Sequence, residues 1–256
     1  MRVPPPLDTH AHIAADISTR DLQVLGAHLF AMTRSLAEFE AVRGRSDRRA
    51  IWGVGTHPGL VGAQKAFRSE LFESAVRHTP LVGEVGLDGG SRVPLALQTS
   101  TLRSVLEVLQ QTPRLISVHS AGAQLEVLRL LHQVPVSGVI LHWWTGSSEL
   151  TEEAVRLGCY FSVPPALMSS VELLRAIPSD RLLPETDHPF GDRRTSPPRR
   201  PGGVSEVEAN LAAHLGASQP DVRRLLWRNL STVIADTDTA DLFPLAWKDI
   251  FSRNIG

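Results

Sequence analysis

Short apolar runs alternate along this chain with longer segments in which apolar residues recur at helical spacing. The strand-like runs are residues 7–10, 28–33, 50–56, 81–85, 115–119, 138–142, 159–163 and 182–186. The segments with helical period are residues 66–78, 98–111, 122–133, 149–157 and 169–177, and Ser148 is the expected cap of the fourth. Repeated strand–helix alternation predicts a parallel sheet, and eight strands favour closure into a TIM (β/α)8 barrel.

The last part of the chain has a different pattern. Residues 192–203 are rich in Pro, Arg and Gly, and helix-like segments follow at 205–215 and 220–234. The tail, residues 236–256, has apolar residues at roughly helical spacing, which would pack on the barrel or meet a partner protein. We therefore expect one domain, residues 1–256, with this tail as its closing element.

Composition restricts the range of partners. The 256 residues are 42% hydrophobic, which is enough for the core of one such barrel. Lys and Arg number 26 and Asp and Glu 27, so binding of a polyanion would need a local basic patch. The single cysteine, Cys159, fits a reducing compartment, and neither a signal sequence nor a bilayer-length apolar run is found. We expect a cytoplasmic protein without a membrane partner.

His, Glu and Asp residues mark the ends of the strand-like runs. His10 and His12 are two residues apart on an extended segment, so both imidazoles point to one side. Similar ends carry the side chains of His57, Glu84, His119, His142 and Asp187. In a parallel barrel these ends meet on one face, where imidazoles and carboxylates would hold Zn, Mn or Fe. Glu84 could bridge two cations, and Asp187 could also accept the proton of an attacking water.

Six motifs in order resemble those of the TatD family of metal-dependent deoxyribonucleases. They are Asp-Thr-His-Ala-His (8–12), Gly-Thr-His-Pro (55–58), Gly-Glu-Val-Gly-Leu-Asp (83–88), Ser-Val-His-Ser (117–120), Leu-His-Trp-Trp-Thr-Gly (141–146) and Glu-Thr-Asp-His-Pro (185–189). The resemblance implies an amidohydrolase-like TIM barrel that uses two divalent ions, Mg, Mn or Zn, to hydrolyse DNA, typically from a 3′ end. Within the family, the motifs look most like the TatD-like member of Qat anti-phage defence operons, which implies partner subunits.

The resemblance also assigns roles to residues. One metal would be held by His10, His12, Glu84 and Asp187, and the second by Glu84, His119 and His142. Asp187 and Glu84 would be the catalytic carboxylates, and His57 would face the substrate phosphate or help a further metal. The sequence departs from the family pattern at three places expected to lie near the substrate. Residues 13–15 separate His12 from the acidic residue that commonly follows it in the family. Residues 89–91 stand where the family often has aromatic residues, and Ala121 stands where it usually has an arginine.

Further residues are candidates for binding substrate. Arg193, Arg194, Arg199 and Arg200 could grip phosphates, or lie in a solvated loop. Trp143 or Trp144 could stack on a base, with the other in the core. Asp88 would hydrogen-bond a ligand imidazole or cap its own loop, and Asn229 would bond backbone beneath the site.

Three functions remain open at this point. The first is a metal-dependent DNase acting on DNA strands, single-stranded or at 3′ ends. The second is a metal-dependent hydrolase of an amide or ester, because the same centre serves both and fold does not fix function. The third is a subunit of a defence complex that is inactive alone. Phosphate-binding cations around the site favour the first, and one closed pocket favours the second.

Overall fold

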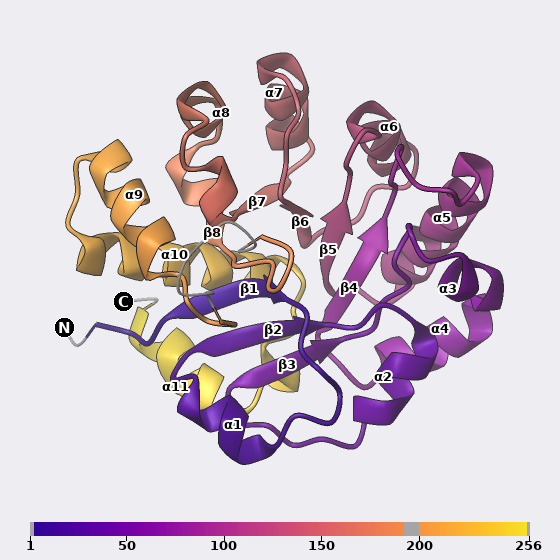
Figure 1. Ribbon diagram of the computed structural model, residues 1–256, viewed down its shortest axis with the longest axis horizontal. Helices are drawn as coiled ribbons and strands as arrows, with labels where there is room; N and C mark the ends of the chain where they lie inside the picture. Colours follow the sequence, from indigo (N-terminus) through magenta and orange to yellow (C-terminus); the bar gives the residue numbers. More distant parts are fainter. Residues whose placement is uncertain (1–2, 192–199, 255–256) are drawn as a thin grey trace.

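In the computed structural model, residues 3–191 and 200–254 are described. Within them the strands alternate with helices in chain order (Figure 1). The strands are β1 (Leu7–Ala11), β2 (His28–Met32), β3 (Ala50–Gly53), β4 (Leu81–Gly86), β5 (Leu115–His119), β6 (Val139–His142), β7 (Tyr160–Val163) and β8 (Leu182–Pro184). All their pairings are parallel and join consecutive strands, as the alternation in the sequence predicts.

Two bridges close the strands into a barrel. Hydrogen bonding divides them into one sheet of β1–β3 and another of β4–β8. Val54 bridges to Val82, which joins β3 to β4, and Ala11 bridges to His188, which joins β1 to the segment after β8. The TIM-barrel expectation is therefore confirmed for the described residues.

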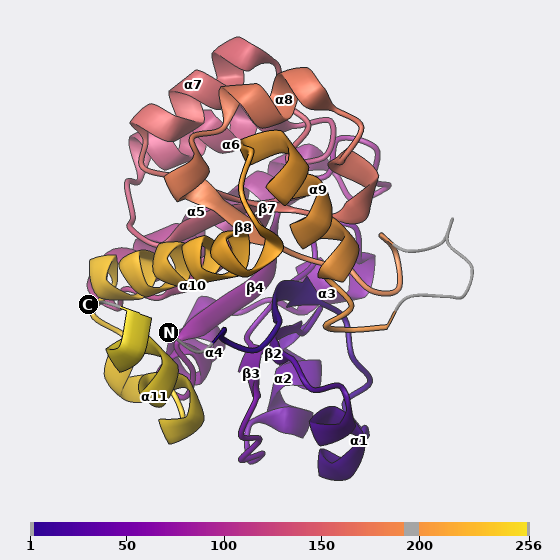
Figure 2. The same ribbon diagram turned by 90° about the vertical axis from the view of Figure 1, so that its left-hand side faces the viewer.

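The helices lie outside the barrel and at one end of it (Figures 1 and 2). They are α1 (Thr19–Val24), α2 (Leu36–Val42), α3 (Val61–Ala66), α4 (Ser69–Val76), α5 (Leu95–Gln111), α6 (Gln124–Gln133), α7 (Ser148–Arg156), α8 (Val171–Ala176), α9 (Ser205–Leu215), α10 (Gln219–Asp236) and α11 (Leu245–Asn254). Short 3-10 turns occur at Pro165–Leu167, Ser179–Arg181 and Ala240–Leu242. In the described part of the chain, no helix combines the length and apolar character needed to cross a bilayer.

Several predicted boundaries were wrong. The side chain that caps α7 is Ser147, whose hydroxyl accepts from the amide of Leu150, and Ser148 is already helical. The third strand ends at Gly53 and not at residue 56. The predicted helix 66–78 begins at the last residue of α3, Ala66, and otherwise contains the shorter helix α4. Helices α1, α2 and α3, of six or seven residues, are too short to show a clear apolar period.

The barrel interior is apolar at the end where the strands begin. Each strand sends one large side chain into this layer: Leu7, Phe30, Ile51, Leu81, Leu115, Ile140, Tyr160 and Leu183. Because strand side chains alternate, the residue two places further along returns to the interior. At that level lie Ser117, His142, Ser162 and Glu185, all buried. The alternation of side chains along the strands therefore places polar side chains inside the barrel near the carboxyl ends of the strands.

Helices α10 and α11 close the apolar end. Trp227 of α10 is fully buried, and its indole N–H donates to the Pro5 carbonyl at 2.8 Å. Trp247 of α11 stacks on Phe30 of β2, with ring centroids 5.5 Å apart, and Phe251 contacts both tryptophans. Figure 2 shows the two helices together on one side of the barrel. The apolar side chains described in the tail thus pack beneath the strands.

Candidate metal centre

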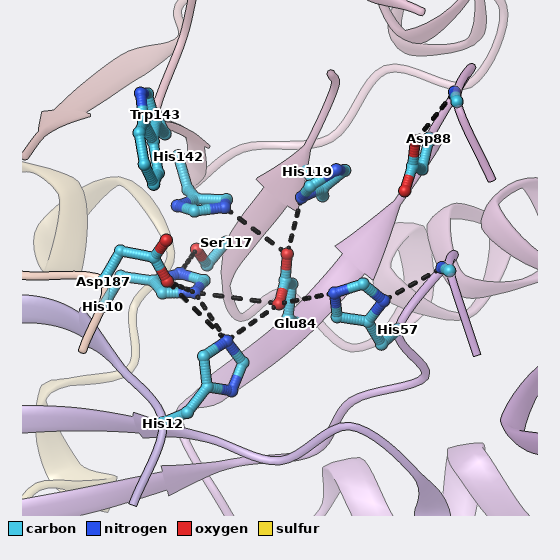
Figure 3. Close-up of polar contacts among 12 residues, drawn as sticks. His10, His12, His57, Glu84, Asp88, Ser117, His119, His142, Trp143 and Asp187 are labelled. Carbon is cyan, nitrogen blue, oxygen red and sulfur yellow. Dashed lines mark hydrogen bonds and ion pairs between the residues drawn. The ribbon is translucent and has the colours of Figure 1, made fainter. Parts of the chain in front are cut away.

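The polar end of the barrel brings six candidate ligands together. His10 lies in β1 and His12 just after it, Glu84 in β4, His119 and His142 at the last positions of β5 and β6, and Asp187 three residues after β8. Figure 3 shows their side chains converging on one point, together with His57. These residues were singled out as ends of separate strands, and the closed barrel is what makes them neighbours.

Glu84 is at the centre of the cluster. The side chain is 2% exposed, and five imidazoles lie within 3.8 Å of its two oxygens. Oε1 lies 2.7 Å from His119 Nδ1 and 3.4 Å from His142 Nε2. Oε2 lies 3.1 Å from His12 Nε2, 3.4 Å from His57 Nε2 and 3.8 Å from His10 Nε2. The two oxygens of one carboxylate thus face two different groups of imidazoles.

Asp187 completes the first of these groups. Its Oδ1 lies 3.7 Å from His10 Nε2 and 3.8 Å from His12 Nε2. The backbone of Asp187 has φ 45°, which is uncommon for a residue with a side chain, and its amide donates to the carbonyl of His10 at 2.9 Å. This backbone bond to β1 fixes the carboxylate beside the two histidines.

A second set of polar groups orients the imidazoles from behind. Nδ1 of His10 lies 2.8 Å from the hydroxyl of Ser117, and Nδ1 of His142 lies 3.3 Å from Oε1 of Glu185. The hydroxyl of Ser162 donates to the other oxygen of Glu185. When these partners accept the Nδ1 proton, the lone pair of each Nε2 is left facing the cluster.

Burial and neighbouring charges shift the pKa values of the candidate ligands. Burial would raise the pKa of Glu84, but the imidazoles, His57 first among them, hold it well below its usual range. Burial raises the pKa of Asp187 to about 8, and neighbouring carboxylates add to the rise. Burial, followed by the charge of His142, lowers the pKa of His10, which favours its neutral form. Neutral imidazoles and ionised carboxylates bind cations, so the shifts favour the binding forms of His10 and Glu84, whereas a cation at Asp187 would displace a proton.

The donor set fits divalent cations. Donor atoms about 2.0–2.2 Å from one cation lie roughly 3–3.5 Å from each other. His10 Nε2 and His12 Nε2 are 3.4 Å apart and share Glu84 Oε2 and Asp187 Oδ1 as neighbours within 3.8 Å. Three triads each have their donor atoms within 4.8 Å of one another: His10 with His12 and Asp187, His57 with Glu84 and His119, and His10 with His142 and Glu185. The cluster is thus able to hold metal.

A cavity of about 440 Å³ opens over the cluster. Its lining consists of His12, His57, Glu84, His119, Ser120, Ala121, His142, Trp143, Thr145, Asp187 and Phe190. Within the described residues no lysine or arginine contributes to this lining. The cavity therefore combines a polar floor with a wall that carries no cationic side chain from the described part of the chain.

The residues predicted to bind substrate differ in their location relative to the cavity. Trp143 is half-buried and lines the cavity, whereas Trp144 is fully buried, so one tryptophan is in the core as expected. Arg193, Arg194 and Arg199 lie outside the described residues, and Arg200 is exposed and is not part of the cavity lining. Asp88 accepts from the amide of Gly90 at 2.9 Å, in agreement with the loop-capping alternative.

Of three further residues near the site, Asn229 was predicted from the sequence, whereas Glu185 and Phe190 were not. Asn229 donates to the carbonyls of Ser179 and Leu182, which confirms its expected backbone contact beneath the site. Glu185 was not considered, although it stands beside Thr186 and Asp187 in a quoted motif. The sequence feature that could have identified Glu185 is its position at the end of an apolar run. A carboxylate buried there needs a partner, because an unpaired buried charge is costly. Phe190, on the cavity wall, carried no sequence signal that separates it from a surface aromatic.

Comparison with known proteins shows the family to which the chain belongs. The model of the family described as "TatD related DNase" matches residues 7–235. The chain belongs to this family. Membership indicates a hydrolase that acts on phosphoester bonds. The fold is also that of a TatD homologue from Escherichia coli, with a TM-score of 0.77, 21% identity and coverage of 89% of this chain and 96% of that one.

Two curated relatives have names that describe an activity. The chain is 27% identical to the uncharacterized metal-dependent hydrolase YabD of Bacillus subtilis, over 74% of this chain and 85% of that protein. It is also 27% identical to the 3'-5' ssDNA/RNA exonuclease TatD of Klebsiella pneumoniae, over 69% of this chain and 74% of that protein. The family match, residues 7–235, spans all the candidate metal ligands.

Gly89 and Ala121, at two of the positions where we expect the sequence to differ from the TatD pattern, are in contact. The amide of Gly89 donates to the carbonyl of Ala121 at 2.8 Å, which joins the loop after β4 to the loop after β5. A Cβ atom on Gly89 would lie 2.3 Å from the carbonyl oxygen of Gly122. Only glycine permits this approach. The loop after β4 and the loop after β5 are therefore tightly packed against each other, and Ala121 of the second lines the cavity.

Proposed function

We propose that the chain is a divalent-metal-dependent nuclease that removes nucleotides from the end of a DNA strand. The observation that carries the proposal is the convergence of five imidazoles and Asp187 around the buried carboxylate of Glu84. A single strand with a 3′ end is the substrate we favour, supported by the name of the Klebsiella relative. An anti-phage role with partner subunits, and a cytoplasmic location, follow from the motif resemblance and the single cysteine.

Two cation positions are proposed from the two faces of Glu84. His10, His12, Asp187 and Oε2 of Glu84 would hold one ion, and His119, His142 and Oε1 of Glu84 the other. Mg, Mn or Zn are the candidates. Such a pair supplies hydroxide at neutral pH and charge for the attacked and leaving oxygens of a phosphodiester.

Asp187 is the proposed proton acceptor. It lines the cavity, so its carboxylate reaches both the cluster and a water that enters beside the substrate. The backbone bond from its amide to His10 keeps the side chain at this point while the proton moves.

His57 is the proposed donor to the substrate phosphate. Its Nδ1 accepts from the amide of Gly59 at 2.9 Å, so in the neutral ring the proton is on Nε2. Nε2 faces Oε2 of Glu84 at 3.4 Å, and the side chain is 21% exposed. A protonated nitrogen does not bind metal, which favours the contact with phosphate over a further cation. Trp143 would stack on a base, and Arg193, Arg194, Arg199 and Arg200 would bind phosphates further along the strand.

One observation favours a second function. The described cavity lining holds no arginine or lysine. A small uncharged amide or ester would not need such a cationic side chain in order to bind. A deacylase-like hydrolase with the same centre is the alternative, and a defence-complex subunit active only on assembly is the other.

A metal-dependent cleavage assay tests the proposal. Chelated protein would receive Mg, Mn or Zn in turn, with single-stranded and duplex DNA labelled at the 3′ or the 5′ end. We expect metal-dependent shortening from one end. Binding of metal without cleavage of any DNA would reject the isolated nuclease, and amide and ester substrates or assembly with partners would then be tested in its place.

A further inference from the structure

One side wall of the cavity is aromatic, and the described residues that form it carry no charged side chain. Trp143 and Phe190 both line it, together with Ala121. Phe190 is 38% exposed, and its ring meets His12 edge-on at 5.4 Å between centroids. Ser120 and Thr145 add hydroxyl groups to the same lining. The described residues of this wall offer a phosphate no cationic side chain, whereas they offer a flat, partly polar group a stacking surface and hydrogen-bonding partners.

The position of Trp143 is fixed by Glu185, which lies behind the candidate ligands. Its backbone has φ 41°, in the left-handed region that a residue with a large side chain rarely adopts. The amide of Trp143 donates to Oε1 of Glu185 at 3.1 Å, and the same oxygen lies 3.3 Å from Nδ1 of His142. One buried carboxylate thus fixes both a candidate ligand and the aromatic residue next to it. In Figure 3 the Trp143 ring lies next to His142, to one side of Glu84.

We propose that this wall is a nucleobase subsite that receives the base of the terminal nucleotide, with Trp143 and Phe190 as the base-stacking residues. The inference rests on the proposed nuclease function and deepens it. A cavity of about 440 Å³ is in the range that holds one small ligand, and the carboxylates of Glu84 and Asp187 lie in the same lining. The bond to be cleaved is therefore placed next to the base that the wall binds.

The kinetic test compares two ends of the same strand. One oligonucleotide has an ordinary terminal nucleotide, and the other has an abasic terminal residue joined by the same phosphodiester. Base stacking contributes roughly 1–3 kcal/mol, which corresponds to about a 5- to 150-fold higher kcat/KM for the ordinary end. In Trp143→Ala and in Phe190→Ala we expect this ratio to fall several-fold, and in Trp143→Phe to recover in part. Leu125→Ala removes an exposed apolar side chain of α6 outside the cavity and is the matched control.

A binding measurement separates this inference from the nuclease proposal. With Ca in place of the active metal, deoxythymidine monophosphate should quench the tryptophan fluorescence, and Trp143→Phe should remove most of that quenching. Deoxyribose 5-phosphate, which has no base, should bind more weakly by a similar factor. A wild-type enzyme that cleaves ordinary and abasic ends equally well overturns the subsite and leaves the nuclease standing. Base-dependent quenching without cleavage of any DNA supports the subsite while the nuclease proposal fails. Base-independent binding overturns the subsite in either case.

Discussion

The amide and the hydroxyl of Thr186 both donate to the carboxylate of Asp8, at 2.9 and 2.7 Å, although the two residues are 178 positions apart. Asp8 is fully buried and also accepts from the amide of Gly202 at 2.8 Å. These bonds join β1 to the segment after β8, where the barrel closes. They also fix the residue that precedes Asp187.

Asp8→Ala should destabilise the protein, because it leaves several buried donors without an acceptor. We expect the free energy of unfolding to fall by about 2–4 kcal/mol, measured by urea denaturation. Asp16→Ala, at an exposed position near the same strand, is the control and should change stability by less than about 0.5 kcal/mol. Equal effects of the two substitutions would contradict the closing role of Asp8.

Asp187→Asn should abolish hydrolysis while the fold is retained. The amide cannot accept the proton of an attacking water and is a poorer cation ligand, so we expect kcat to fall by about 10²–10⁴-fold. Circular dichroism and thermal unfolding check the fold, and Asp180→Asn, at an exposed position, controls for the loss of a carboxylate. An active Asp187→Asn protein would falsify the assignment of the proton acceptor.

Glu185→Gln should weaken metal binding although Glu185 lies behind the cluster. The amide can still accept from Trp143, but it can also present its NH₂ group to His142 and thereby disfavour the tautomer that faces Glu84. We expect a 10–100-fold loss of affinity for Mn, measured by titration calorimetry. The exposed Glu172→Gln is the control. Unchanged affinity would reduce Glu185 to a packing role.

His28 should make stability depend on pH. Burial, with a smaller contribution from Arg49, lowers the pKa of His28 to about 3, and its ring packs against Trp227 and Trp247 at centroid distances of 5.3 and 4.7 Å. Between pH 3 and 6.5 the imidazole is protonated in the unfolded chain and neutral in the folded one. Protons therefore favour unfolding in this window, and stability rises with pH by up to about 1.4 kcal/mol per unit from this group.

The comparison that isolates this contribution is His28→Phe, which keeps an aromatic ring between the two tryptophans. Urea unfolding of both proteins at several pH values gives the slopes. We expect a smaller slope in the variant between pH 4 and 6. Identical slopes would mean that other groups produce the whole dependence.

The arginine-rich loop can be tested through salt. If Arg199 and Arg200 contact phosphates, changing both to Ala should weaken DNA binding and lower the slope of log Kd against log salt by up to about 2. Arg129 and Arg156 are exposed on α6 and α7, and their double Ala variant controls for net charge. An unaltered slope in the first variant would remove this loop from the path of the strand.

The local pattern determined much of this protein by itself. Alternation of apolar runs and helical periods is a property of neighbouring residues, so it predicted the parallel strands and the long helices α5, α6 and α10. His10, His12, Glu84, His119, His142 and Asp187 could be named because each ends or follows a strand-like run, and all parallel strands end on one face. Short helices such as α1 and the end of β3 escaped prediction, since a six-residue segment holds too little periodic signal.

The tertiary structure alone decided which atoms meet. Glu185 became part of the site because the barrel brings its carboxylate to His142 and Trp143, which lie 43 and 42 positions away. The cavity wall formed by Trp143 and Phe190, and the loop contact between Gly89 and Ala121, likewise depend on the distance between separate strands. Sequence patterns record the side to which a residue points, because that follows from the backbone period. The partner that it meets depends on closure of the whole chain.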